Sequence, residues 1–231
     1  MNKLDKKIPE LKDLKDYRNN NFIESSLVEI PNNKGLIISL EYKKIGFKNA
    51  LDKMLIRKEV LDRLILAKKY LPENITFKIW DSYRTLALQK ELYDYYKDKL
   101  IKDYNLKDLC TEEQNKVISK FVSIPNYDIE NPPLHTTGGA IDLTLIFTDT
   151  LEELDMGTHF DNFTDKAKTN YYEESNNLKV RNNRRILYNA MINAGFTNLP
   201  SEWWHYDYGN RAWAYYKNYK TRYKGIFNLD K

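Results

Sequence analysis

The chain has 231 residues, of which 42% are hydrophobic and 30% charged, a composition that suits one globular domain with a substantial core. Its 37 basic and 33 acidic side chains are interspersed and leave a net charge of only +4, which argues against a nucleic-acid-binding protein. A single cysteine excludes an internal disulfide and a zinc-finger type of site.

The chain carries no recognisable targeting or membrane segment. No apolar stretch of the secretory type follows the N-terminus, and the longest apolar runs, such as 36–38, are too short to cross a bilayer. We therefore expect a cytoplasmic protein that contacts neither a membrane nor a nucleic acid. Residues 1–20 are expected to form a polar N-terminal segment of the domain.

Two strands and three helices are predicted in the first half of the chain, after a polar, irregular start over residues 1–34. Apolar residues three and four positions apart indicate a helix, whereas alternating β-branched or aromatic residues indicate a strand. The predicted strands are 36–43 and Ile75–Tyr83, and the predicted helices are Arg57–Tyr70, Leu86–Tyr104 and 112–122.

The second half begins with a long loop over residues 123–139, and long ordered loops often carry functional residues. The elements predicted after it are a strand over Ala140–Phe147, a mostly looped stretch with one short helix over Thr148–Asn183, a helix over Arg184–Ala194, and strands over Phe196–Asn198, Glu202–Tyr208 and Ala212–Tyr219. Helices and strands come in blocks, so we predict an α+β fold. It is a single domain over 1–231 with a central antiparallel sheet, flanking helices and long loops.

Residues able to carry chemistry gather in two short segments. Two of the three histidines, His135 and His205, stand near acidic residues. His135 ends the long loop, and Asp142 follows on a strand between two apolar residues, where a carboxylate needs a cationic partner. A zinc ion or an arginine would serve as that partner. The alternative is that Asp142 pairs with a lysine and that His135 is an exposed loop residue.

The second segment places Glu202 three residues before His205, in an aromatic stretch that contains Trp203 and Trp204. By itself, His205 could be a core residue bonded to a carbonyl. The two side chains converge only if Glu202 lies on a loop that begins near Pro200, because residues three apart on a regular strand face opposite ways. A glutamate that lies close to zinc without binding it is the usual base of a metallopeptidase.

A third segment places Arg84 directly after a predicted strand. Hydrolysis of an amide develops an oxyanion, which a guanidinium group can stabilise. We count Asp81 among the substrate-binding residues, because its carboxylate can hold Arg84 in position. The alternative for this segment alone is an ordinary exposed arginine at the end of a strand. His159 has no apolar flank and is predicted to be a loop residue.

With these residues in hand, the chain resembles the D-alanyl-D-alanine dipeptidases known from vancomycin resistance. Their superfamily also includes D,D-carboxypeptidases, phage endolysins and the zinc domain of hedgehog proteins. The blocks that carry the resemblance follow the family's order, and they are 81–84, 133–142, 156–161, 183–188, 194–198, 200–205 and 213–216.

The resemblance implies a zinc peptidase that cleaves D-Ala-D-Ala, the dipeptide of two D-alanines. One zinc ion per chain would be bound by His135, Asp142 and His205. Glu202 would be the general base, and Arg84 would stabilise the oxyanion.

The resemblance also implies two substrate-binding residues. Asp161 would face the free amine of the substrate, and Tyr17 would assist in binding the substrate. Two positions depart from the family's pattern: Pro133 replaces a serine expected to contact substrate, and Thr85 replaces the proline after the arginine. Two alternatives therefore stay open. One is a D,D-carboxypeptidase or cell-wall endopeptidase of the same superfamily, and the other is a zinc-bearing binding module without turnover.

Overall fold

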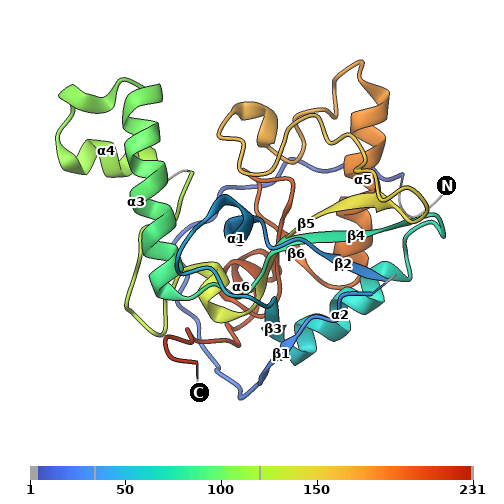
Figure 1. The fold of residues 1–231 in the computed structure, drawn as a ribbon, viewed down its shortest axis with the longest axis horizontal. Coiled ribbons are helices and arrows are strands. Elements are labelled where there is room, and N and C mark those ends of the chain that lie inside the picture. The colour runs from blue at the N-terminus through green and yellow to red at the C-terminus, as the bar shows by residue number, and fades with distance from the viewer. Residues whose placement is uncertain (1–4, 34, 120, 230–231) are drawn as a thin grey trace.

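The computed structural model describes residues 5–33, 35–119 and 121–229 (Figure 1). The strands in this part of the chain are β1 (Leu27–Glu29), β2 (Leu36–Ile38), β3 (Leu55–Arg57), β4 (Ile75–Asp81), β5 (Ala140–Phe147), β6 (Thr197–Asn198) and β7 (His205–Asp207). The α-helices are α1 (Glu41–Ile45), α2 (Lys58–Lys68), α3 (Leu86–Asp103), α4 (Thr111–Ile118), α5 (Leu178–Asn193) and α6 (Arg211–Lys217). None of these described helices is long and apolar enough to cross a membrane.

The central sheet of the described residues has the strand order β2-β4-β5-β7-β6. Strands β4, β5, β7 and β6 pair antiparallel, as predicted, whereas β2 pairs parallel with β4. A parallel pair needs a crossover connection, and the chain between β2 and β4 provides one through α1, β3 and α2. The predicted α+β class is therefore confirmed, with one parallel pair at the edge of the sheet.

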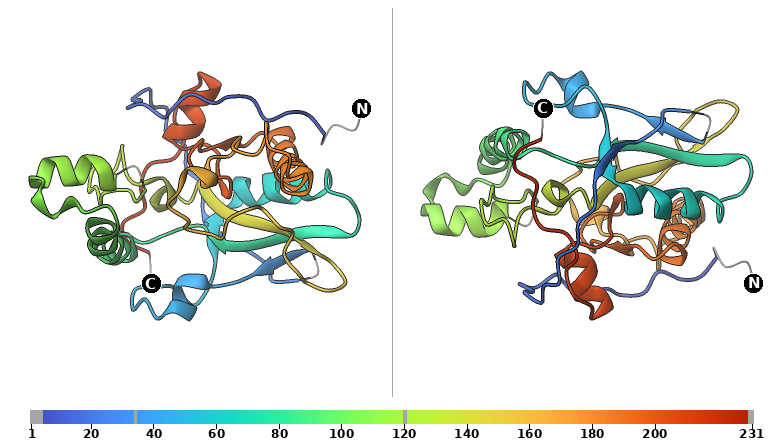
Figure 2. Two further views of the ribbon diagram at one scale, coloured as in Figure 1. Left: turned by 90° about the horizontal axis from the view of Figure 1, so that it is seen from above. Right: turned by 90° about the horizontal axis from the view of Figure 1, so that it is seen from below.

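One face of the sheet is apolar and is covered by α2 and α5 (Figure 2). Ile141, Leu143 and Leu145 alternate along β5 and are fully buried in the main core, which also contains residues of both helices. Because successive side chains of a strand point to opposite faces, Asp142 and Thr144 lie on the other face. The alternation that builds the core thus directs one carboxylate away from it.

Helices α3 and α4 project from the body as an arm (Figure 1). A second hydrophobic cluster holds this arm together and joins it to α1 through residues that include Tyr42, Leu92, Tyr96 and Val122. The arm thus has its own core, distinct from the core between the sheet, α2 and α5.

Several predicted elements are corrected by the structure. The strand predicted over 212–219 is replaced by helix α6, which ends at Lys217. The side chain of Asn210 accepts hydrogen bonds from the first backbone N–H groups and starts a helix among strand-favouring aromatics. Helix α5 begins at Leu178 rather than Arg184, since the Asn177 side chain caps it. The strand predicted over 36–43 ends at Ile38, where α1 soon follows. A separate sheet formed by β1 and β3 was not predicted.

Candidate metal centre

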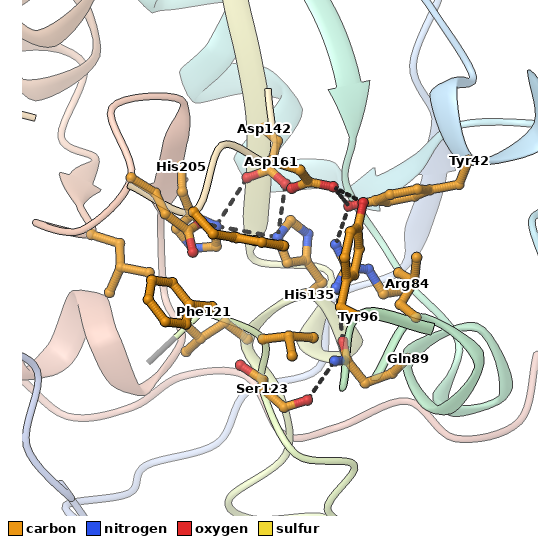
Figure 3. Close-up of a pocket in the computed structure, with 16 residues that line it drawn as sticks. Tyr42, Arg84, Gln89, Tyr96, Phe121, Ser123, His135, Asp142, Asp161 and His205 are labelled. Carbon is orange, nitrogen blue, oxygen red and sulfur yellow. Dashed lines mark hydrogen bonds and ion pairs between the residues drawn. The ribbon is translucent and has the colours of Figure 1, made fainter. Parts of the chain in front are cut away.

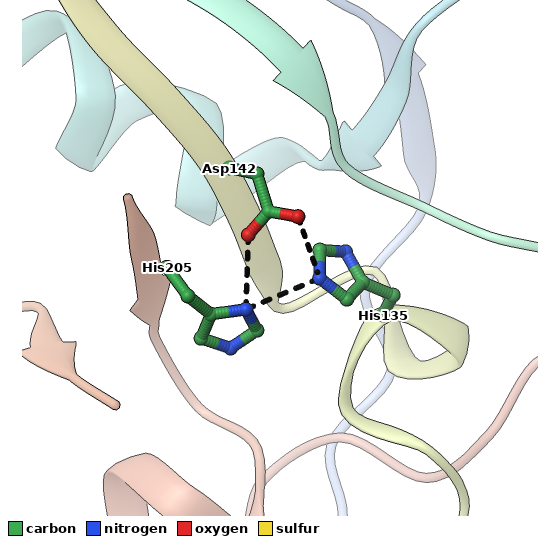
Figure 4. A group of neighbouring side chains, drawn as sticks. All are labelled: His135, Asp142 and His205. Atoms are coloured by element: carbon green, nitrogen blue, oxygen red, sulfur yellow. Dashed lines mark hydrogen bonds and ion pairs between the residues drawn. The ribbon is translucent and has the colours of Figure 1, made fainter. Parts of the chain in front are cut away.

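His135, Asp142 and His205 meet on the face of the sheet opposite to α2 and α5 (Figure 4). His135 sits in a 3-10 turn (Leu134–Thr137) at the end of the long loop, while Asp142 and His205 are direct register partners on the antiparallel strands β5 and β7. The Nε2 atom of His135 lies 3.2 Å from Nδ1 of His205, and Asp142 lies 3.3 Å from the first nitrogen and 2.9 Å from the second. All three side chains are buried.

The outward contacts of the two imidazoles direct their lone pairs toward each other. His135 Nδ1 lies 2.7 Å from the carbonyl oxygen of Ser82, and His205 Nε2 lies 3.1 Å from a carboxylate oxygen of Asp207. Both partners are acceptors, so these outer nitrogens carry protons, and a neutral imidazole at either position presents a bare nitrogen to the centre of the cluster. Two such nitrogens and a carboxylate facing one another could hold a cation between them.

The donor set and its spacing fit a divalent metal ion. Zinc binds histidine nitrogens and carboxylate oxygens at about 2.0–2.1 Å, which places tetrahedral ligand atoms roughly 3.3 Å apart. The two inner nitrogens here lie 3.2 Å apart, and each lies 2.9–3.3 Å from one of the two carboxylate oxygens of Asp142. Three protein ligands also leave a fourth position open, as in catalytic rather than structural zinc sites.

The charges of the cluster reinforce this interpretation. Burial by itself would raise the pKa of Asp142, but the facing imidazoles of His135 and His205 lower it well below its usual value. Burial would lower the pKa of His205, yet Asp207 and Asp142 raise it well above the ordinary histidine value. The carboxylates thus favour positive charge at the centre of the cluster.

Glu202 lies beside the cluster without belonging to it. It sits in a turn before β7, and the strand predicted over Glu202–Tyr208 is limited to His205–Asp207. The turn brings the Glu202 carboxylate to 3.8 Å from Nδ1 of His205. The two side chains therefore converge, as expected for a Glu202 that lies outside the strand. Burial raises the pKa of Glu202 to about 8, despite the opposing effect of His205. A cation at the cluster would favour the ionised carboxylate.

Arg84 lines the same pocket and is held by three neighbours. Its Nε and Nη2 donate to one oxygen of Asp81 at 3.0 and 2.6 Å, Nη2 also donates to the Tyr42 hydroxyl at 3.2 Å, and Nη1 donates to Gln89 at 2.9 Å. Burial opposes the charge, but Asp81 more than compensates and raises the pKa of Arg84. The predicted link between Asp81 and Arg84 is therefore present, and Asp81 acts on the guanidinium rather than lining the pocket itself.

A β-bulge turns Asp81 toward this face. The pairing of β4 with β5 shifts by one residue between Ile79 and Asp81, so that Asp81 lies opposite Asp142. In an unbroken register Asp81 would lie opposite Ile141, which points into the core. The inserted residue thus places Asp81, which anchors Arg84, on the side of the sheet that carries the candidate metal ligands.

Asp161 faces the pocket from the loop after β5. Its backbone is left-handed, with φ at 54°, and one carboxylate oxygen accepts hydrogen bonds from the hydroxyls of Tyr42 at 3.1 Å and Tyr96 at 2.9 Å. Burial, assisted by the negative charge of Asp142, raises the pKa of Asp161 to about 6. Asp161 thus presents a carboxyl group to the pocket.

The pocket that joins these groups is small, with a free volume of about 60 Å³ (Figure 3). Sequence reasoning missed part of its wall, namely Tyr42, Gln89, Leu92, Tyr96, 121–123, Leu134, Phe163 and Leu199. It also missed Asp207, which contacts His205 from behind. The sequence around these wall residues does not distinguish them from others of the same type. Tyr42 and Tyr96, for example, are two among 18 tyrosines.

Two residues considered from the sequence lie elsewhere. The Tyr17 hydroxyl donates to the carbonyl oxygen of Tyr219 at 2.7 Å, and its ring contacts Tyr215 edge-on, outside the residues that line the pocket. His159 is exposed and lines a separate cavity of about 310 Å³ with Trp80, Trp203 and others. It takes no part in the His135 cluster.

Comparison with known proteins identifies relatives of this chain. The profile of the D-Ala-D-Ala dipeptidase family matches residues 44–225. Over 180 residues the chain is 31% identical to a D-alanyl-D-alanine dipeptidase of Synechocystis sp., covering 71% of this chain and 72% of that protein. Over 149 residues it is 30% identical to a D-alanyl-D-alanine dipeptidase of Enterococcus faecium, covering 64% and 70%. A protein of the same name from Enterococcus faecalis is 32% identical over 124 residues, covering 50% and 59%.

Proposed function

The chain belongs to the D-Ala-D-Ala dipeptidase family of peptidases, and on this premise we propose that it hydrolyses D-alanyl-D-alanine to two D-alanines with one bound zinc ion. The observation that carries the proposal is the buried triangle of His135, Asp142 and His205 with the carboxylate of Glu202 beside it, 3.8 Å from His205 Nδ1. A purely structural zinc site has four protein ligands and needs neither a nearby base nor Arg84.

Glu202 is the general base of the proposed reaction. His135, Asp142 and His205 would hold the zinc ion, which would supply Lewis acidity and lower the pKa of the attacking water. The Glu202 carboxylate takes a proton from the attacking water and returns it to the nitrogen of the leaving D-alanine. Burial, which raises the pKa of Glu202, makes its carboxylate a stronger base than that of an exposed glutamate.

Arg84 and Asp161 orient the substrate. The Arg84 guanidinium donates to the carbonyl oxygen as negative charge develops on it in the transition state. Asp161 binds the free ammonium group of the dipeptide by a charge-assisted hydrogen bond. The position of Asp161 in the pocket wall favours a short substrate, because a peptide with an extended N-terminus would have to place further atoms beyond it.

The decisive experiment compares D-Ala-D-Ala with its N-acetylated form, which lacks the ammonium group. We expect release of alanine from the free dipeptide, loss of this activity with a chelator, recovery on addition of zinc, and at least a hundredfold lower kcat/KM for the acetylated form. Equal cleavage of both substrates would favour a carboxypeptidase or endopeptidase. Zinc binding without release of alanine from either would indicate a binding module.

The roles proposed for Glu202 and His205 can be distinguished by substitution. Glu202→Gln keeps the size of the side chain but cannot accept the proton, so we expect kcat to fall by roughly 10²–10⁴ while one zinc ion per chain is retained. His205→Ala should lose both turnover and zinc, as measured by metal analysis after dialysis. Full activity of Glu202→Gln on the dipeptide would rule out this base.

A further inference from the structure

Gln89 connects the catalytic arginine to a wall of the pocket that lies far away in sequence. It is the fourth residue of α3 and is fully buried. Its Oε1 accepts from Arg84 Nη1 at 2.9 Å, and its Nε2 donates to the carbonyl oxygen of Ser123 at 2.7 Å (Figure 3). Ser123 belongs to the segment 121–123, which follows α4 and lines the pocket.

The chemistry of the two partners determines the orientation of the amide. Arg84 can only donate and the Ser123 carbonyl can only accept, so the oxygen of Gln89 must face the first and its NH2 group the second. The amide is the only one of the common side chains of this size that satisfies both contacts at once. A carboxylate would repel the Ser123 carbonyl, and an apolar side chain would leave both partners unpaired.

The Arg84 guanidinium has two anchors on different nitrogens. Asp81 holds Nε and Nη2, and Gln89 holds Nη1. With the Tyr42 hydroxyl, the described residues engage four of the five N–H groups, which leaves one on Nη1 for a ligand. Because Gln89 binds the other hydrogen of this same nitrogen, it determines the direction in which the free one points.

We propose that Gln89 is a positioning residue that aims Arg84 at the substrate and seats the wall segment 121–123 against α3. The segment is otherwise fastened to the arm, since Val122 belongs to the second hydrophobic cluster and the Phe121 ring contacts Tyr104 at the end of α3. Gln89 therefore joins the arm to the catalytic face at the point where Arg84 acts. The catalytic half of this inference rests on the proposed function.

A double-mutant cycle tests the catalytic half. Gln89→Met removes both hydrogen bonds at similar volume, and we expect kcat on D-Ala-D-Ala to fall about tenfold with KM changed less than twofold. In an Arg84→Ala background the same substitution should change kcat less than twofold, because there is no guanidinium left to position. An equal loss in both backgrounds, or no loss in the parent, would overturn the positioning role.

Hydrogen exchange tests the structural half without any activity. Backbone amides in a peptide covering 121–126 should exchange at least fivefold faster in Gln89→Met than in the parent. Gln89→Glu should show the same faster exchange, because it keeps an acceptor for Arg84 but repels Ser123. Unchanged exchange in both variants would refute the link to the wall.

A matched control variant and the parent enzyme distinguish failure of the Gln89 proposal from failure of the proposed function. Gln114 in α4 also donates to backbone carbonyls, those of Leu106 and Leu109, and touches neither Arg84 nor Ser123. Gln114→Met should therefore leave kcat unchanged. If the zinc-loaded parent released no alanine, the proposed function would fail. The hydrogen-exchange rates of the backbone amides in 121–126 would then decide whether Gln89 holds the segment 121–123 against α3.

Discussion

Asp161 shows how one residue can combine recognition with a cost to stability. Its carboxylate accepts hydrogen bonds from two tyrosine hydroxyls at the pocket wall, and burial raises its pKa to about 6. A carboxyl whose pKa rises on folding binds more protons in the folded state, so its ionisation destabilises the fold as pH rises from about 4 to 6. The charge is retained, in our interpretation, because it binds the substrate ammonium.

This residue leads to a prediction about pH. In the parent, kcat/KM for the dipeptide should fall as pH decreases through about 6, where Asp161 becomes protonated and loses its attraction for the ammonium group. Asp161→Asn should lower kcat/KM at pH 7.5 by about ten- to a hundredfold, the loss typical of a charged hydrogen bond. The dependence near pH 6 should disappear.

Chemical denaturation provides an independent check of the same residue. Asn retains an oxygen that can accept from Tyr42 and Tyr96 but carries no buried charge. The variant should therefore be more stable than the parent at pH 7, by about 1 kcal/mol, with the difference shrinking toward pH 4. A variant less stable than the parent at pH 7 would show that the carboxylate is not destabilising.

At the level of elements, helix α6 supports the metal centre from behind. Its capping residue Asn210 accepts from the N–H groups of Ala212 and Trp213, and its amide NH2 donates to Asp207 at 2.5 Å. Asp207 in turn contacts His205. A single buried side chain thus starts a helix and orients the carboxylate that contacts His205, a candidate metal ligand.

We expect Asn210→Ala to lower the free energy of unfolding by about 1–2 kcal/mol, the usual cost of losing an N-cap. It should also weaken zinc binding by about tenfold, because Asp207 loses its donor and His205 is held less firmly. Urea denaturation and competition with a chromogenic chelator measure the two effects. Asn182→Ala, at an exposed position within α5, serves as the control and should change neither.

At the scale of the whole molecule, the ligands come from a loop and from two strands of the central sheet. An ion that binds them therefore ties the long loop to the core. Ligands that bind only the folded state stabilise it by mass action, by about 2.7 kcal/mol at a hundred times Kd. For a domain of this size each kcal/mol corresponds to roughly 2–4 °C.

Zinc at a hundred times its Kd should raise Tm by roughly 5–10 °C over the chelated protein, as followed by circular dichroism. His135→Ala should fold but lose most of this shift, because one of three ligands is gone. A shift of the same size in the variant would mean that zinc stabilises the fold at another place.

The local periodicity of the sequence predicted α2, β4 and β5 close to their observed bounds, because helix and strand spacing are properties of neighbouring residues. The ligand set and Glu202 could also be proposed from the sequence. Few residue types bind zinc, and the chain contains only three histidines. The roles of these residues, and that of Tyr17, stay predictions until the variants are measured.

Other features were decided only by the tertiary structure. Helix α6 was predicted as a strand because its aromatic residues favour strands, whereas the cap at Asn210 starts a helix. The bulge that turns Asp81 toward the site depends on strand register, which one strand by itself does not specify. Tyr42, Gln89 and Tyr96 reach the pocket through packing of the arm, and contacts between distant segments leave no periodic trace in the chain. The sequence by itself thus determined which chemistry was available, and the fold decided which side chains surround it.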